Sequence, residues 1–211
     1  TKRSTIKTEM QTACLTKKSF SLSDKLSFPP SSKLLFMTTQ ELSTKKEAIE
    51  TMLQKHPEIT LILDMEADSQ GQLNLTSQDL PERLKHLVII NLKQDATSIE
   101  NFFLLGCSHL RSLDFSHLSN LTSIGDFFLA GCSQLISLDF SHLSSLTSIG
   151  NFFLSGCAHL RSLDLSHLSN LTSIGNFFVS GCSLARSNIA LPSIETSETA
   201  NSLISAHLDC L

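Results

Sequence analysis

Charged residues are scarce in this chain of 211 residues, where they make up 17% of the total and leave a formal net charge of −4. So small a charge gives no electrostatic reason to bind nucleic acid or an anionic membrane. No apolar run approaches the ~20 residues that cross a bilayer, so we expect no transmembrane segment. A secretory signal peptide is also missing from a sequence that begins at Thr1, which favours the cytoplasm if that absence is genuine.

The short motifs of common enzyme classes are absent as well. The sequence contains no GxSxG, HExxH, GxxxxGKS/T or GxGxxG. Each of these patterns places a nucleophile, a metal or a phosphate against the groups that act on it. We therefore predict that the chain is not an enzyme and needs no cofactor.

What is abundant is repetition. Three consecutive 25-residue units begin at Cys107, Cys132 and Cys157, and each ends at a glycine. The third unit reads CAHLRSLDLSHLSNLTSIGNFFVSG, and the other two differ from it at few positions. A fixed period of this length indicates a solenoid, in which each unit buries its apolar side against its neighbours. Solenoids present long surfaces, so the pattern predicts a scaffold that binds a protein partner.

The first half of each unit has the pattern of a strand. In the segment 110–115 the apolar residues stand at the first, fourth and sixth places. Because side chains alternate along a strand, Leu113 and Phe115 are expected to point inward and Asp114 outward. Parallel strands of successive units would then stack into one sheet.

The second half of each unit predicts a return path with a short helical turn. Gly125 is expected to make a turn and Asp126 to cap the helical segment. Phe127 and Phe128 would fill the core, and Gly131 would end the segment in a left-handed conformation.

The four cysteines at the start of successive units share one phase of the coil, which is typical of a core position. We expect buried thiols rather than disulfides, because side chains stacked in parallel seldom reach the disulfide torsion. The remaining two cysteines could pair or stay free, and cysteine usage does not fix the compartment. The repeated cysteines are Cys107, Cys132, Cys157 and Cys182, and the other two are Cys14 and Cys210.

The composition divides the chain into four parts. The first is a flexible tail, basic and rich in Ser and Thr, for which an organelle transit peptide is the alternative. An N-terminal α/β cap, the leucine-rich repeats and an irregular C-terminal tail follow. Their predicted ranges are 1–38, 39–79, 80–183 and 184–211.

The cap is predicted from a helix followed by strands. The capping-box pattern at 44–47 predicts a helix start there, with Ala48, Ile49, Met52 and Leu53 on one face. Pro57 would end this helix. Short strands are then expected at 59–63 and 73–75, and the first repeat, two residues shorter than the others, near His86.

After Cys182 the repeat fails, since Ala185, Asn188 and Ala190 stand where leucines are due. We interpret this as a truncated array or as a coding frame that slipped. About four units with one uncapped end also predict either marginal stability or self-association through an exposed strand edge.

The segment LTSIGNFFLSGC, followed by HLRSLDLS, resembles the BspA-like class of leucine-rich repeats. The resemblance covers about residues 86–183. It departs from the class by having Phe-Phe where Ala-Phe is usual, and His-Leu after the strand where Pro is frequent. It implies an α/β solenoid with a parallel sheet on the concave face, short helical turns on the convex face and an N-terminal helix–strand cap. It also implies an adhesin-type protein, secreted or on the surface of a microbe that meets a host.

We predict that a partner binds the concave strand face. Three aspartates at one strand position put like charges side by side, which costs stability unless the face is used. A calcium site with the adjacent serines is a weaker alternative. The expected binding positions are Arg111, Ser112, Asp114, Ser116, Ile136, Ser137, Asp139, Ser141, Arg161, Ser162, Asp164 and Ser166.

Recurrent histidines invite a zinc interpretation, which we reject. Zinc needs four ligands that converge on one point, whereas a repeat spreads its ligands along the axis. His117, His142 and His167 also lie in a different part of the unit from the cysteines.

The sequence is compatible with three functions. A surface adhesin is favoured by the resemblance, and an intracellular adaptor or effector by the missing signal. A decayed array without present activity is favoured a little by the broken last repeat.

Overall fold

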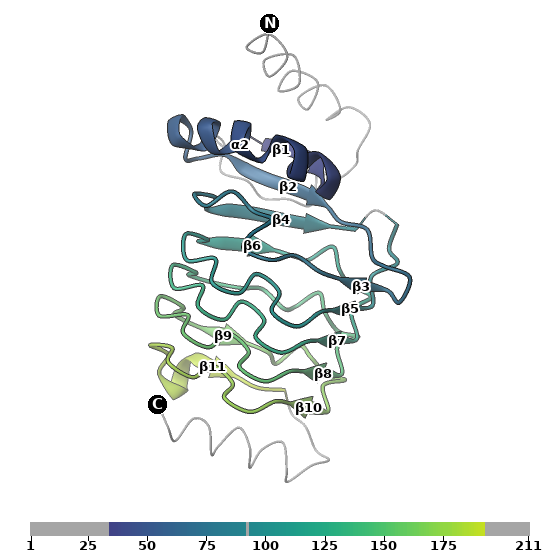
Figure 1. Cartoon of the computed structure of the whole chain (residues 1–211). Coiled ribbons are helices and arrows are strands. Elements are labelled where there is room, and N and C mark those ends of the chain that lie inside the picture. The colour runs from purple at the N-terminus through teal and green to yellow at the C-terminus, as the bar shows by residue number, and fades with distance from the viewer. Residues whose placement is uncertain (1–33, 92, 193–211) are drawn as a thin grey trace, which may run out of the picture.

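The computed structural model describes residues 34–91 and 93–192, and these form one coil whose turns stack from the cap towards the C-terminus (Figure 1). The first sheet consists of β1 (Leu34–Thr38), β2 (Thr60–Asp64), β4 (His86–Ile90) and β6 (Ser112–Asp114). All pairs in it are parallel, in the order β1-β2-β4-β6. Two later strands, β9 (Leu163–Asp164) and β11 (Ile189–Ala190), pair with each other. The solenoid of parallel strands is thereby confirmed.

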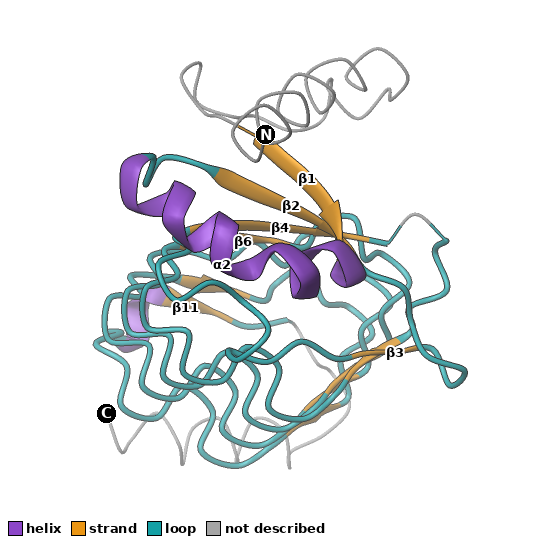
Figure 2. Cartoon of the chain, turned by 45° about the horizontal axis from the view of Figure 1, so that its top comes forward, coloured by secondary structure: helices purple, strands orange, loops and turns teal. Residues whose placement is uncertain are grey.

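A second parallel sheet lies on another side of the coil, where the sequence predicted only a return path (Figure 2). Its strands have two residues each, and four of them are the Ser-Ile pair of the repeat. Each repeated threonine before that pair adds a side-chain bond to the previous turn, as Thr147 Oγ1 does to the Thr122 carbonyl at 2.9 Å. The strands are β3 (Gln72–Leu73), β5 (Ser98–Ile99), β7 (Ser123–Ile124), β8 (Ser148–Ile149) and β10 (Ser173–Ile174).

The cap begins earlier than predicted. Residues 34–38, assigned to the N-terminal tail, form β1, because this apolar run pairs along its whole length with β2. Helix α2 spans Thr39–Lys55, and its capping box is Thr38 with Glu41 rather than Thr44 with Glu47. Both pairs fit the same pattern, so sequence alone did not separate them. The rest of the predicted tail, residues 1–33, lies outside the described residues.

The third side of each turn is not helical, which corrects the prediction. Phe127, Leu129 and Gly131 all have positive φ, at 59°, 54° and 75°. The Phe127 carbonyl accepts from Ala130 N–H and the Leu129 carbonyl from Cys132 N–H, so the segment is a chain of tight turns. Such turns use a positive φ at their third residue, which fits glycine best. The left-handed conformation predicted for Gly131 is confirmed.

Gly125 and Asp126 have other tasks than those predicted. A Cβ at Gly125 would lie 2.7 Å from Asn101 N, so this glycine permits close packing of neighbouring turns. Asp126 caps no helix: its Oδ1 accepts from Asn151 N–H at 2.7 Å, and its own N–H donates to Asn101 Oδ1 at 2.7 Å. These side chains form a ladder that ties each repeat to the next.

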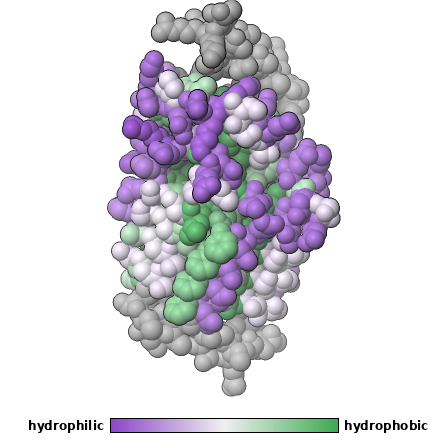
Figure 3. All heavy atoms as spheres, viewed as in Figure 1, coloured by the Kyte–Doolittle hydropathy of each residue, from purple (hydrophilic) through white to green (hydrophobic). Residues whose placement is uncertain are grey.

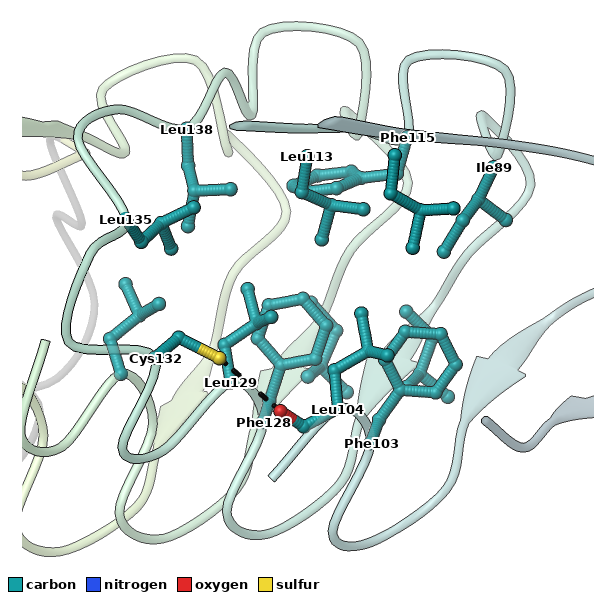
Figure 4. Packing of buried hydrophobic residues seen from close by; sticks show 14 of the residues in the cluster. Ile89, Phe103, Leu104, Leu113, Phe115, Phe128, Leu129, Cys132, Leu135 and Leu138 are labelled. Carbon is teal, nitrogen blue, oxygen red and sulfur yellow. Dashed lines mark hydrogen bonds between the residues drawn. The ribbon is translucent and has the colours of Figure 1, made fainter. Parts of the chain in front are cut away.

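Leucines and phenylalanines of successive turns fill the interior (Figure 4). Phe128 is fully buried and stacks between Phe103 and Phe153, with ring centroids 5.9 and 5.4 Å away. Cys132 is also fully buried, and its Sγ donates to the Leu104 carbonyl at 3.2 Å. The predicted core positions of Phe128 and Cys132 are confirmed. Phe127 was also predicted to fill the core, but it is only half-buried, and its equivalents Phe102 and Phe177 keep about half of their surface exposed.

The repeat continues beyond Cys182, contrary to the irregular tail predicted from residue 184. In β11, Ile189 pairs with Leu163, which is 26 residues earlier instead of 25. One inserted residue therefore explains the leucines missing at 188 and 190, because Ile189 and Leu191 take their places. The leucine due at 185 is not recovered by this shift. Leu191 packs against the core, so this last unit follows the path of the others and needs no slipped frame.

Candidate functional site

The predicted binding residues lie on one face, which we call the strand face: the outward side chains of residues 111–116, 136–141 and 161–166, which include β6 and β9. Backbone bonds align its first row, since Ile136 N–H donates to the Arg111 carbonyl at 3.2 Å and Arg161 N–H to the Ile136 carbonyl at 3.4 Å. Ser112 and Ser137 form a bridge in the next row. The structure thus brings these residues together, as the repeat pattern predicted.

The side chains of the first row project from the surface. Arg111 and Arg161 are exposed, and Ile136 between them keeps 46% of its surface exposed. Arginine and exposed aliphatic side chains are typical anchors of protein interfaces. The row therefore presents one cationic side chain on each side of an apolar one.

Each aspartate of the strand face has a structural role that the sequence did not reveal. Asp139 Oδ1 accepts from Ser141 N–H at 2.8 Å, and Asp164 Oδ1 from Ser166 N–H at 2.9 Å. These bonds close a turn at the end of the strand, in which the Asp side chain accepts a hydrogen bond from a backbone N–H two residues later. Hydrogen bonds from Ser141 and Ser166 also hold the pKa of Asp139 and Asp164 below the ordinary value. Both carboxylates stay ionised in neutral solution.

Asp114 closes the same kind of turn, through Ser116 N–H at 2.9 Å. The repeated aspartates are thus explained by turn closure, and a calcium site is not needed to account for them. Among the described residues, no group of three or more His, Cys, Asp or Glu side chains is arranged to hold a metal ion. The histidines and cysteines of successive repeats do not converge either.

The strand face is open only from β6 onward. Towards the cap the outward residues Ile62, Val88 and Ile90 form a small apolar cluster of their own, with 9%, 3% and 2% of their surface exposed. Their inward neighbours belong to the main core, so β2 and β4 are buried on both sides. Strands buried on both sides read as continuous apolar runs, as HLVII does.

His86 lies at the border of the open part. Its Nδ1 is 2.8 Å from Ser112 Oγ. Burial, with Arg111 and Lys85 nearby, lowers the pKa of this histidine. A neutral ring at this border leaves Arg111 as a cation at the start of the open strand face.

A comparison with protein families matches residues 75–202 to the BspA type leucine rich repeat region in six copies. The match covers more than half of the chain, which therefore belongs to this family. Six copies exceed the four units predicted, because the match begins before His86 and continues past Cys182. No curated protein and no solved structure matches the chain.

Membership of this family gives the class of protein. Its repeats generally serve in protein interaction and adhesion, and they are typically scaffolds rather than enzymes. Among the described residues no helix is long and apolar enough to span a bilayer.

Proposed function

We propose that this chain is a scaffold that binds a protein partner on the open part of the strand face. The observation that carries the proposal is the aligned row of Arg111, Ile136 and Arg161. The core and the cap pack without these side chains, so packing does not explain their presence on the surface. The stiff coil already holds these side chains in register, so binding a partner costs little conformational entropy.

The chemistry of the face indicates the partner. The arginine row runs beside a row of aspartates, so the face presents basic and acidic side chains in neighbouring lines. A complementary surface would carry an acidic and a basic line around one apolar residue for Ile136. Such a pattern favours a folded protein surface or an extended segment of mixed charge over a uniformly charged polymer.

Two settings fit this activity. An adhesin at the cell surface would use the face towards a host protein, and family membership supports that setting. An intracellular adaptor would use the same face to recruit a target, and the reduced, unpaired Cys107, Cys132, Cys157 and Cys182 support that setting. Protease treatment of intact cells distinguishes the settings, because only a surface protein is digested.

The experiment that tests binding is a quantitative pull-down with the full chain and a variant carrying Arg111→Glu, Ile136→Ser and Arg161→Glu. These side chains are exposed, so the variant is expected to keep the circular dichroism spectrum and lose the partner. Arg83→Glu is the matched control, because Arg83 is exposed in the segment before β4, outside the strand face. Equal recovery of partners with all three proteins would refute the proposal.

A further inference from the structure

Four phenylalanines form an exposed column on the turns, away from the strand face. Their rings stack nearly parallel, with centroid distances of 5.1, 4.6 and 4.6 Å along the column. The first and last keep 50% and 52% of their surface exposed, and the middle two are half-buried. Figure 3 shows an apolar stripe over the turns of this face, beside a hydrophilic line. The members of this phenylalanine column are Phe102, Phe127, Phe152 and Phe177.

The residues that carry these exposed rings also have an unfavourable backbone conformation. Phe127 and Phe152 have φ of 59° and 55°, a conformation that bulky residues rarely adopt. Leu129 and Leu154 share that conformation, but their side chains are completely buried, which offsets its free-energy cost. Phe127 and Phe152 gain ring stacking, but part of their apolar surface still faces water. The outer edges of these two rings are therefore exposed apolar surface.

The border of the column is almost free of charge. On one side runs the ladder of Asn101, Asp126, Asn151 and Asn176, in which Asp126 is the one acidic residue. On the other side lie small residues such as Gly131 and Ser155. An apolar centre with a neutral polar rim is the composition of a protein interface core.

We propose that this surface associates with a second copy of the same chain, with the two columns antiparallel. A two-fold axis that crosses the column between Phe127 and Phe152 places evenly spaced rungs opposite one another. Phe127 then meets Phe152 of the second copy, and the contact is the same in both directions. In this orientation Asp126 lies opposite Asn151 of the second copy, so no two carboxylates meet.

The size of the surface predicts how strong the association is. Two half-exposed rings and two less exposed ones offer at most roughly 400 Å² per copy, since a whole Phe side chain buries about 200 Å². Stable interfaces bury about 800 Å² on each partner. The pair is therefore a weak, reversible dimer that forms at high concentration or when chains are held close together, as on a surface.

Sedimentation velocity of the full chain between roughly 1 µM and 1 mM tests the proposal. The sedimentation coefficient is expected to rise with concentration in the wild type. Phe127→Ser with Phe152→Ser should weaken the association at least ~10-fold, because central aromatic contacts dominate an interface. Ile136→Ala removes a more exposed apolar side chain from the strand face and should leave self-association unchanged.

A wild type that stays monomeric up to the highest concentration overturns the proposal without any variant. The same holds if Ile136→Ala abolishes the association, which would place the contact on the strand face. Circular dichroism and thermal unfolding show whether the double variant is folded. If it is not, Phe152→Ala replaces it, and unchanged association of this variant would count against the column.

Discussion

Phe152 and Phe153 are neighbours in the chain, yet they belong to two different columns of rings. Phe152 is half-buried and stacks at 4.6 Å on Phe127, whereas Phe153 is fully buried and stacks at 5.4 Å on Phe128. Phe153→Ala should cost about 3–5 kcal/mol, since it leaves a cavity in the core. Phe152→Ala should cost about 1–2 kcal/mol, for the loss of two ring stacks. Urea denaturation of both variants measures the difference, and equal losses would contradict the assignment of the two columns.

Gly150 should tolerate no side chain. An added Cβ would lie 2.5 Å from Asp126 Oδ1 and 2.6 Å from Asp126 N, and the backbone there cannot move without breaking the ladder between repeats. We expect Gly150→Ala to cost about 3 kcal/mol or more.

Gly106→Ala is the control for that prediction. A Cβ at Gly106 meets nothing within 4 Å, although its φ of +75° disfavours alanine. A loss of about 1 kcal/mol is expected for it. Thermal unfolding compares the two variants, and the opposite order would show that φ, not crowding, decides at these glycines.

The repeat period allowed the main features of the structure to be predicted. Any residue at the phase of Leu113 must face the core in each turn, so strands, buried thiols and the grouping of Arg111 with Arg161 follow from periodicity alone. The second sheet was missed because two-residue strands such as Ser148–Ile149 have no alternation to detect. The turns of the third side were taken for a helix because Phe127 and Leu129 adopt a φ that their residue types disfavour.

The thiols of Cys132 and Cys157 should be unreactive in the native protein. The neighbouring thiol hydrogen-bonded to each, followed by burial, raises the pKa of both. A thiol that stays protonated is a poor nucleophile. Alkylation at pH 8 followed by mass mapping should label the half-buried Cys107 first and the other two only after unfolding. Rapid labelling of Cys157 under native conditions would disprove this packing.

His86 should make stability depend on pH. Its folded pKa lies below the ordinary 6.5, so the unfolded chain takes up a proton first as the pH falls. Its contribution is therefore complete above pH 6.5 and is lost as the pH falls towards the folded pKa. The free energy of unfolding should drop less between pH 7.5 and 5.5 in His86→Gln than in the wild type. Identical drops would exclude this histidine as the cause.

The limits of the repeat array could not be predicted from the sequence for two physical reasons. Thr38 with Glu41 and Thr44 with Glu47 are equally good capping boxes, and only pairing of the preceding strand with β2 selects the first. At the other end, one inserted residue before Ile189 shifts every later leucine position, although the coil absorbs it in the segment before β11. Local patterns carry neither kind of tertiary information.

The most direct test of binding on the strand face is hydrogen exchange of the full chain, alone and with a captured protein partner. Exchange should become slower in residues 111–116, 136–141 and 161–166 and stay unchanged in residues 127–131 and 152–156 on the turns. Protection confined to the turns, or found in neither region, would place the partner site away from Arg111, Ile136 and Arg161.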